Sequence, residues 1–313
     1  MEDIFKLYNN CILCPRECKV DRSQKRGVCK SSDKCKIARA ALHYWEEPCI
    51  SGTSGSGTIF FEGCSLGCVF CQNYEISDSK EEHGVEVSVD KLVEIFFSLK
   101  EKGANNINFV TPTHFMPHIK KAIIKAKEQG FDLPFVYNTS GYEKVECLRE
   151  LEGLIDVYLP DMKYADDIND VSSQSNIAYV YSRAKDYFEN SKLAIAEMYR
   201  QVGTPRFDAD GIIRKGVIVR QLILPNHTKN SMRVVEYLYN TYKDDIFISI
   251  MNQYTPVNTP RLETFPKLQR AITKREYDKV IDYALTLGVK NAFIQEGGTC
   301  SESFIPDFSN QLL

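Results

Sequence analysis

Apolar and polar residues alternate along the chain in blocks whose lengths fit strands and helices in turn. From Thr58 onward, short continuous runs of β-branched and aromatic residues predict strands that are buried on both faces of a parallel sheet. These runs cover residues 58–61, 106–110, 134–138, 155–160, 217–224, 246–251 and 291–295. Between them lie stretches that predict helices at residues 89–102, 117–129, 144–151, 231–240 and 273–287, with one long helix within 176–202.

Glycines support this succession of elements. Gly103, Gly130 and Gly288 each fall just past one predicted helix, where a left-handed cap is favoured. Repeated strand–helix units of this size predict an α/β fold with a parallel barrel, whole or partial. In such barrels the carboxyl ends of the strands and the loops after them form the site. Functional residues are therefore expected directly after the strands.

Composition fits one large globular domain. The 313 residues are 43% hydrophobic and 26% charged, with a net charge of −3, which suffices for a sizeable core. No apolar run approaches the length of a membrane span, and the N-terminus lacks a signal-peptide core. The eleven cysteines are an odd number clustered at metal-ligand spacings. They favour a reducing, cytoplasmic compartment over a disulfide framework.

The first 40 residues are basic, with ten Lys or Arg and five Asp or Glu. A basic arm can bind nucleic-acid phosphates. However, aromatic residues that would stack on bases are not interleaved in this segment. We favour the interpretation that the cations offset thiolates around a metal and solvate a small lobe, and we predict no nucleic-acid partner.

Cys64, Cys68 and Cys71 follow the first predicted strand at C-x3-C-x2-C spacing. Three thiolates on one glycine-bearing loop can hold three corners of a cubane iron–sulfur cluster and leave one iron open for chemistry. Structural zinc is the alternative, but it needs four closely spaced ligands, and the next candidate is His83 in a polar stretch. The spacing therefore favours the iron–sulfur cluster.

Four further cysteines lie near the N-terminus at C-x2-C-x3-C-x10-C spacing: Cys11, Cys14, Cys18 and Cys29. This segment is too polar to form a core, so metal ligation would be its organising force. Zinc and a second iron–sulfur cluster both suit four thiolates, and free, reduced cysteines are the alternative. Cys35 and Cys49 are candidate substitutes for one ligand, whereas Cys147 and Cys300 stand alone.

Polar side chains follow several of the strands. They are Thr111, Thr113 and His114 after the second strand, Asn138, Thr139 and Ser140 after the third, Asp161 and Lys163 after the fourth, and Asn252, Gln253 and Tyr254 after the sixth. Any one such cluster is weak evidence, because Asn, Thr and Pro are common in turns. Several clusters at the same end of one barrel predict a shared site.

With these features, the chain resembles the radical S-adenosylmethionine (SAM) superfamily. The resemblance rests on the three cysteines, with Phe70 before the last of them, after the first strand of a βα barrel. Other segments resemble a poorly characterised subgroup of the branch similar to pyruvate formate-lyase activating enzyme: HYWEEPCISGTSGSGTIFFEGCSLGCVFCQNYEIS, NINFVTPTHF, VYNTSGYE, DVYLPDMKY and MNQYTP. The resemblance implies a partial parallel (β/α)6-type TIM barrel at residues 51–300. A Cys-rich metal-binding lobe at residues 1–50 precedes it, and a tail at residues 301–313 follows it.

The resemblance implies that Cys64, Cys68 and Cys71 bind a 4Fe–4S cluster and that SAM chelates its open iron. Asp161 and Lys163 match the Asp-x-Lys pair of activating enzymes and are the predicted catalytic residues. The complete predicted SAM pocket comprises Phe70, Asn73, Thr111, Thr113, His114, Asn138, Ser140, Asp161, Lys163 and Gln253.

The sequence also departs from the pattern of the relatives at two places. Thr111-Pro112-Thr113 replaces the usual Gly-Gly-Glu that holds the SAM amino group, so hydroxyls or backbone groups must take over that hydrogen bond. At the sixth strand, Gln253 and Tyr254 stand where the activating enzyme has a His near SAM. An exact transfer of the substrate from the activating enzymes is therefore not expected.

The implied chemistry is reductive cleavage of SAM to methionine and a 5′-deoxyadenosyl radical, which abstracts hydrogen from a substrate. We expect a flavodoxin- or ferredoxin-type one-electron donor, and a protein or peptide is one candidate substrate. A glycyl-radical activating enzyme is the alternative, although such enzymes with extra clusters carry eight cysteines after the motif, whereas this chain has its extra cysteines before it. A third interpretation is a non-catalytic iron–sulfur or zinc protein for electron transfer or nucleic-acid binding, for which a SAM pocket would have no use.

Overall fold

The apolar runs of the sequence form a parallel sheet. The computed structural model describes residues 3–78, 83–165, 176–295 and 308. In order across the sheet, the parallel strands are β2 (Ser56–Phe61), β4 (Ile107–Val110), β5 (Phe135–Thr139), β6 (Val157–Pro160), β8 (Ile213–Leu222), β9 (Phe247–Met251) and β10 (Ala292–Ile294). Every residue of β2 and of β5 is buried, as expected for strands that are covered on both faces.

Antiparallel strands add to this sheet in two places. Beyond β2, β1 (Lys36–His43) pairs with β2, and β3 (Val85–Glu86) pairs with β1. Elsewhere, β7 (Arg206–Phe207) pairs with β8. Among the described strands the sheet is open, with β10 at one edge and β3 at the other. The predicted partial parallel barrel is therefore confirmed.

The division into 1–50, 51–300 and 301–313 stays a prediction. β1 lies within the range predicted for the N-terminal lobe and yet belongs to the main sheet, so the sheet begins before residue 51. Apart from Phe308, the predicted tail lies outside the described residues, as does Cys300.

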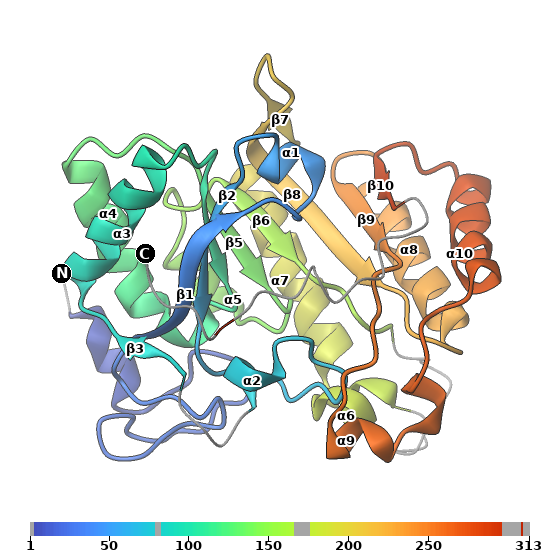
Figure 1. The fold of residues 1–313 in the computed structure, drawn as a ribbon, viewed down its shortest axis with the longest axis horizontal. Coiled ribbons are helices and arrows are strands. Elements are labelled where there is room, and N and C mark those ends of the chain that lie inside the picture. The colour runs from blue at the N-terminus through green and yellow to red at the C-terminus, as the bar shows by residue number, and fades with distance from the viewer. Residues whose placement is uncertain (1–2, 79–82, 166–175, 296–307, 309–313) are drawn as a thin grey trace.

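Helices between the parallel strands pack in neighbouring pairs. α3 (Val89–Glu101) contacts α4 (Met116–Glu128), α5 (Val145–Arg149) contacts α7 (Tyr187–Val202), and α8 (Thr228–Tyr242) contacts α10 (Lys274–Leu287). Figure 1 shows the first pair at one side of the molecule and the last pair at the other. Local sequence fixes their ends: Thr273 and Glu276 form a capping box at the start of α10, and Gly288 ends it with φ 92°.

The long helix predicted within 176–202 is α7, which has 16 residues, and the structure places a second, shorter helix before it in the same range. α6 (Ile177–Ser182) ends at Arg183, whose φ of 56° is left-handed, and α7 begins at Tyr187. Neither Gly nor Pro marks this break in the sequence. The carbonyls of Ser182 and Arg183 instead accept hydrogen bonds from Arg16, so a contact distant in sequence stabilises the end of α6.

Short elements gather at both ends of the parallel strands. Figure 1 shows α2 (Tyr74–Ser77), α6 and α9 (Pro260–Glu263) at the bottom of the view, and α1 (Pro48–Ser51) with β7 at the top. α2 follows β2 closely, so the bottom is the carboxyl end of the strands. The remaining short helices are η1 (Ile4–Tyr8), η2 (Thr113–Phe115) and η3 (Pro266–Leu268).

No helix in the described ranges combines the length and the apolar character needed to cross a membrane.

A buried arginine, Arg22, connects the N-terminal segment to the barrel. The Arg22 side chain is 1% exposed, and its guanidinium lies 4.5 Å from the ring centroid of Tyr8 and 5.5 Å from that of Phe115. It donates a hydrogen bond of 2.5 Å to the carbonyl of His114 and another to the carbonyl of Ser32. A buried cation that reaches both segments in this way resists their separation, because opening would leave its charge unpaired.

Candidate active site

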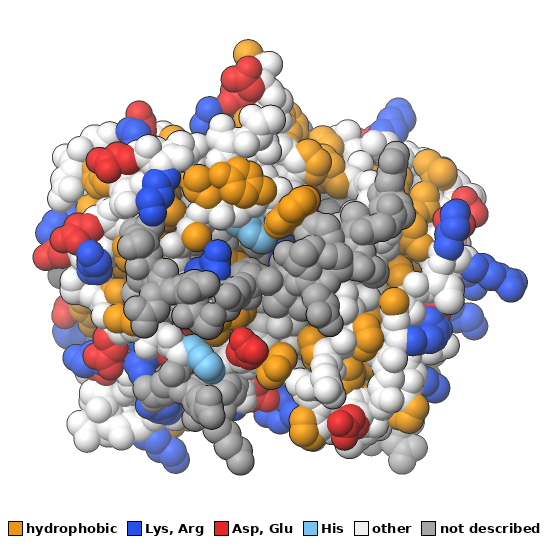
Figure 2. All heavy atoms as spheres, viewed as in Figure 1, with side chains coloured by type: hydrophobic (Ala, Val, Ile, Leu, Met, Phe, Trp, Pro, Cys, Tyr) orange, Lys and Arg blue, Asp and Glu red, His pale blue; other side chains and the backbone are white. Residues whose placement is uncertain are grey.

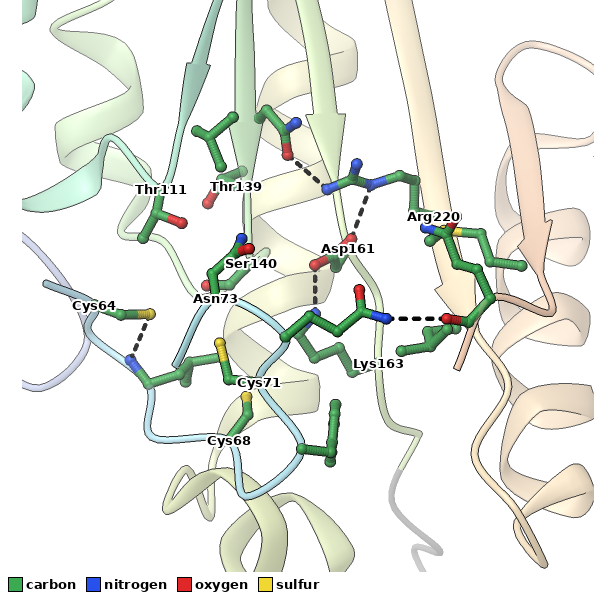
Figure 3. A pocket seen from close by; sticks show the side chains of 18 of the residues that line it. Cys64, Cys68, Cys71, Asn73, Thr111, Thr139, Ser140, Asp161, Lys163 and Arg220 are labelled. Atoms are coloured by element: carbon green, nitrogen blue, oxygen red, sulfur yellow. Dashed lines mark hydrogen bonds and ion pairs between the residues drawn. The ribbon is translucent and has the colours of Figure 1, made fainter. Parts of the chain in front are cut away.

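The three cysteines of the motif face one cavity. Cys64, Cys68 and Cys71 lie on the loop between β2 and α2 and line a cavity of about 230 Å³. In Figure 3 they gather on one side of this cavity, while Asp161, Lys163 and Arg220 lie on the other. The loop thus brings three soft sulfur donors to the carboxyl end of the sheet, where sites form in parallel α/β folds.

Each of the three sulfur atoms has a local hydrogen-bond partner. The backbone N–H of Leu66 donates to Cys64 Sγ at 3.4 Å. Cys68 Sγ lies 2.9 Å from the hydroxyl of Ser182, and Cys71 Sγ lies 3.2 Å from that of Ser77. Such partners orient the sulfurs and stabilise negative charge on them.

Burial keeps these thiols protonated in the absence of a metal. Burial and, second, the neighbouring charge of Cys68 together raise the pKa of Cys71 to about 11. Burial also raises the pKa of Cys64 and of Cys68, although the Lys163 cation acts in the opposite direction on both. A bound metal would displace the protons, since thiolates are the form that ligates.

The donor set fits a cubane cluster. Within the described ranges, no three His, Cys, Asp or Glu side chains are grouped to hold one metal ion. A cubane cluster sets a different requirement, because each cysteine binds a separate iron atom. Three thiols that face one cavity meet this requirement and would leave the fourth iron directed toward the cavity.

Charged residues form the opposite wall. Asp161, just after β6, makes an ion pair with Lys163 and accepts a hydrogen bond of 3.0 Å from Nε of Arg220 on β8. Burial alone would raise the pKa of Asp161, but the Lys163 and Arg220 cations outweigh it and hold that pKa below its usual range. The same carboxylate raises the pKa of Lys163 against the effect of burial. The wall is therefore a charged network at neutral pH.

Glu46 extends this network from the loop after β1. Its carboxylate accepts hydrogen bonds from Asn108 at 3.0 Å, Asn138 at 3.2 Å and Arg220 at 3.3 Å. Arg220 also donates to the Asn138 side-chain oxygen at 2.6 Å. Segments from both halves of the chain are thereby fixed around one cavity.

Most of the residues predicted for the SAM pocket lie together. Those that line the cavity are Phe70, Asn73, Thr111, Asn138, Ser140, Asp161, Lys163 and Gln253. Phe70 is 5% exposed and packs against Tyr254 with ring centroids 6.0 Å apart. The roles of these residues toward SAM stay predictions, but their convergence agrees with the expectation that polar groups follow the strands.

Thr113 and His114 do not line the cavity, which corrects their predicted placement. Both belong to η2, which turns their side chains into the interior. The Thr113 hydroxyl donates to Glu143 at 2.5 Å, and His114 Nε2 lies 2.8 Å from the carbonyl of Glu62. Burial lowers the pKa of His114 to about 3, so this ring is neutral.

The backbone at Thr111 explains this turn. Its φ is 58°, in the left-handed region that a β-branched residue rarely adopts, and its N–H donates to the carbonyl of Asn138 at 2.9 Å. Such a conformation costs on the order of 1–3 kcal/mol. The strain turns the chain directly after β4 and leaves the Thr111 side chain on the cavity wall.

Among the residues of the wall that the sequence did not identify are His43, Trp45, Glu46 and Arg220. Arg220 had a detectable signal, because it is a lone charge within the buried apolar run VIVRQLIL. The other three follow or end β1, an unpredicted strand, so nothing in the sequence indicated that their loop reaches the barrel interior.

The segment with the four N-terminal cysteines touches the loop of the motif through Cys29. Cys18 Sγ and Cys29 Sγ both lie beside Gly27, where a Cβ atom would come within 3.4 and 3.3 Å of them. The N–H of Cys64 donates to the carbonyl of Cys29 at 3.3 Å. A Cβ on Gly63, whose φ is 92°, would lie 2.5 Å from the same carbonyl, so the two cysteine segments can touch only with glycine there.

The two candidate substitutes lie in different places. Cys35 is 1% exposed and belongs to the same core cluster as Cys11, Tyr8 and Leu13. Cys49 belongs to α1, at the opposite end of the sheet, and packs with Ile50 and Val136. Cys49 therefore cannot complete the N-terminal set, because α1 and the motif loop lie at opposite ends of the strands (Figure 1).

The chain is similar to known proteins in sequence and in fold. The chain is 27% identical to the uncharacterized protein MJ0674 of Methanocaldococcus jannaschii over 288 residues, which cover 89% of this chain and 75% of that protein. Among solved structures, Streptococcus suis SuiB bound to precursor peptide SuiA matches with a TM-score of 0.50 and 13% identity, over 75% of this chain. The chain spans about half the length of SuiB, because the match covers 47% of that protein.

A domain of pyruvate-formate lyase-activating enzyme from Bacteroides vulgatus also matches, with a TM-score of 0.35 and 15% identity, over 58% of this chain and 93% of that domain. The finer placement of the chain in the branch of this enzyme still rests on its sequence motifs.

The family model of the radical SAM superfamily matches residues 58–238. This range contains the three-cysteine loop, Asp161, Lys163 and Arg220. The superfamily is defined by a three-cysteine 4Fe–4S cluster that works together with SAM, and the thiols and polar walls of the cavity suit both groups. The chain therefore belongs to the radical SAM superfamily.

Proposed function

We propose that this protein cleaves SAM reductively and uses the product radical to abstract a hydrogen atom from a bound substrate. The observation that supports this most strongly is the single cavity that Cys64, Cys68 and Cys71 share with Asp161, Lys163 and Arg220. When bound, the two groups would supply the chemistry: one electron from the reduced cluster, and in SAM a carbon–sulfur bond whose cleavage gives methionine and a 5′-deoxyadenosyl radical. The chain supplies position, charge and exclusion of water.

The residues of the wall have distinct tasks in this proposal. Lys163 would bind the SAM carboxylate, while Asp161 holds the Lys163 ammonium in place from within the ion pair. Asn138 and Ser140 would bind the ribose, and Phe70 would pack against the adenine. Thr111 and Gln253 offer polar groups where relatives use other residues. In this proposal Asp161 is therefore a positioning group, and Lys163 is the charged residue that would touch SAM.

The N-terminal cysteines would hold a second metal centre, either zinc or an iron–sulfur cluster. One observation supports this: Cys18 Sγ and Cys29 Sγ both lie beside Gly27, so two of the four thiols face the same point of the segment. Free thiols at these positions would interact unfavourably once ionised, as the neighbouring charges around Cys11 indicate. A bound metal would remove this repulsion.

The reaction requires an electron from outside the chain, for which we propose a flavodoxin- or ferredoxin-type donor. The clustered, reduced cysteines support a cytoplasmic location, where such donors and reducing conditions occur. The substrate is proposed to be a small molecule or a peptide. Activation of a glycyl-radical enzyme is the alternative function.

Anaerobic reconstitution with iron and sulfide, followed by reduction with SAM present, tests the proposed function. We expect formation of 5′-deoxyadenosine by the wild type and its loss, by at least about three orders of magnitude, in Cys68→Ala. Cys147→Ala is the matched control, because Cys147 lies on α5 outside the cavity. Normal turnover by Cys68→Ala would overturn the assignment of the cluster.

A deuterium experiment separates the two classes of substrate. Deuterated cell extract is divided by molecular mass, and each fraction is supplied to the reduced enzyme with SAM. Label in 5′-deoxyadenosine from the low-mass fraction supports a small molecule or peptide. Label from large proteins alone would support the glycyl-radical activating alternative.

A further inference from the structure

A second cavity adjoins the active site. It has a volume of about 440 Å³ and lies between the loop after β1 and the strands β9 and β10. Five residues line both cavities: Trp45, Glu46, Arg220, Met251 and Gln253. Because of these shared walls, a molecule in the second cavity would lie beside the place where the SAM radical forms.

The most unusual group in this second cavity is the carboxylate of Glu47. The residue is 8% exposed, it lines the cavity, and its Oε2 has no hydrogen-bond partner among the described residues. The neighbouring Glu46 carboxylate differs, because Asn108, Asn138 and Arg220 all donate to it. A buried acceptor without a partner is rare in folded proteins and indicates that another group satisfies it.

The charges around this carboxylate do not balance. Glu46, Glu47 and Asp161 face two cations, Lys163 and Arg220. The hydrogen bonds of Arg220 go to Asp161, Glu46 and Asn138, and Lys163 pairs with Asp161. Within the described part of the chain, Glu47 therefore shares the charge of Arg220 with Glu46 and Asp161 and receives no hydrogen bond from it. The residues after Gln295, which follow the cavity wall in sequence, include no Lys, Arg or His.

Aromatic side chains stand next to this excess of negative charge. Tyr44 is 50% exposed and Trp45 is 59% exposed, and both line the second cavity. Figure 2 shows hydrophobic side chains gathered over the loop between β1 and α1. Aromatic faces attract cations, and they do so more strongly where water is excluded. A carboxylate with flanking aromatic rings is therefore chemically suited to a cation that carries an apolar skeleton.

We propose that the second cavity binds the substrate of the radical reaction through a cationic group, an alkylammonium or a guanidinium, that pairs with the Glu47 carboxylate and packs against Trp45. This assignment rests on the function proposed above, which places the reactive carbon of SAM next to the shared wall. A free amine and a Lys or Arg side chain of a peptide are the two sources of such a cation, and both present the same chemistry to Glu47.

The surroundings of Glu47 agree with such a ligand. Burial raises the pKa of this carboxyl, and the Glu46 charge raises it further, while Arg220 and the Ser249 hydroxyl act against both. A bound ammonium would remove the cost of the buried charge and favour the ionised form. If Glu47 instead held its proton and donated to a neutral ligand, an alcohol would bind as well as an amine.

The single tryptophan of the chain supplies the measurement. Trp45 is the one Trp in the sequence and lines the cavity, so its fluorescence reports on binding there without any SAM cleavage. Hexylammonium, acetyl-Gly-Lys-Gly-amide and the neutral isostere hexanol would be titrated into the full-length reconstituted protein. We expect both cationic probes to bind at least about tenfold more tightly than hexanol, as one charged pair would provide.

Glu47→Gln is the informative variant, because it keeps the shape and removes the charge. We expect it to weaken binding of the cations by about tenfold or more and to leave hexanol binding unchanged. Glu263→Gln on α9 is the control and should bind like the wild type. Equal affinity of the wild type for hexylammonium and hexanol would overturn the proposal even if Glu47→Gln failed to fold.

The two sources of the cation are separated by their relative affinities. Tighter binding of hexylammonium supports a free amine, and tighter binding of the lysine peptide supports a peptide side chain; failure of both to bind would overturn the proposal. The assay is independent of turnover. Cleavage of SAM without a preference for cations would leave the proposed function standing, whereas a preference for cations without cleavage would leave a binding site whose reaction is misassigned.

Discussion

Two cysteine segments touch in this molecule, yet their surroundings differ. The loop with Cys64, Cys68 and Cys71 faces a cavity whose opposite wall carries Asp161, Lys163 and Arg220. The segment from Cys11 to Cys29 does not line that cavity and is instead held to the barrel by Arg16 and Arg22. The two segments therefore suit different uses, because an open site needs polar groups in front of its thiols, whereas a structural centre, as proposed for the N-terminal segment, needs only closure.

The first prediction concerns the metal in the N-terminal segment and has the largest expected effect. Cys29→Ala should remove this metal and lower the free energy of unfolding by more than about 4 kcal/mol, as loss of a structural metal does. The substitution keeps the Cys29 carbonyl that accepts from Cys64, so the iron of the motif loop should remain. Elemental analysis and urea unfolding check both outcomes.

Cys49→Ala is the matched control, because Cys49 is also buried but lies on α1, at the opposite end of the sheet. It should keep the metal and cost only the small loss of packing of one sulfur atom. Equal metal content and stability in the two variants would remove the distinction between the cysteine segments. The element lost identifies the centre: zinc indicates a structural zinc site, and iron indicates a second cluster.

The second prediction uses Glu143, which lies between the two segments. On the barrel side it accepts hydrogen bonds from Thr113 and Thr139. On the side of the N-terminal segment, its charge raises the pKa of Cys14. Burial raises the pKa of Glu143 to about 7, although the hydrogen bonds oppose this shift. The folded protein therefore holds this proton more tightly than the unfolded chain does. This contribution to stability is complete below the unfolded pKa and is lost as the pH rises through 7.

Glu143→Gln removes this titration. Relative to the variant, the wild type should lose about 3 kcal/mol of unfolding free energy between pH 5 and pH 8. Urea unfolding at several pH values measures it, with Glu146→Gln, an exposed position on α5, as the control. A difference that stays constant with pH would show that Glu143 is ionised throughout this range.

The third prediction tests the contact between the segments and has the smallest effect. The Arg16 guanidinium donates to the carbonyl of Ser65 at 2.8 Å in the motif loop and to that of Ser182 at 3.1 Å. Arg16→Lys loses the planar fork that reaches several carbonyls, and we expect a cost of about 1–2 kcal/mol. Thermal unfolding measures this cost. Arg275→Lys on the exposed side of α10 should change stability by less than about 0.5 kcal/mol, and equal effects would show that Arg16 does not join the segments.

Much of the barrel could be predicted because its strands are continuous apolar runs. These runs, such as TIFF and PFVYN, need burial on both faces whatever their partners are. β1 could not be predicted in this way, because Lys36 and Arg39 interrupt its apolar pattern and its pairing with β2 fixes it as a strand. The break at Arg183 likewise depends on Arg16, a residue 167 positions away.

The site was predictable where it depends on local order and not where it depends on distant pairing. Asp161 and Lys163 could be placed because they directly follow an apolar strand. Glu46 could not, since its role arises from Arg220 and Asn138. Thr113 and His114 were misplaced because the left-handed backbone of Thr111 has no signature in a Thr-Pro-Thr sequence.

The ion pair between Glu46 and Arg220 also constrains when the site can exist. Its partners are 174 residues apart, so during synthesis the charged wall is incomplete until most of the chain has left the ribosome. The three motif cysteines emerge much earlier, at about one fifth of the chain. A nascent chain would thus present its thiols without the wall that later shields them. Maturation of the iron–sulfur centre should therefore follow, rather than accompany, the synthesis of the barrel.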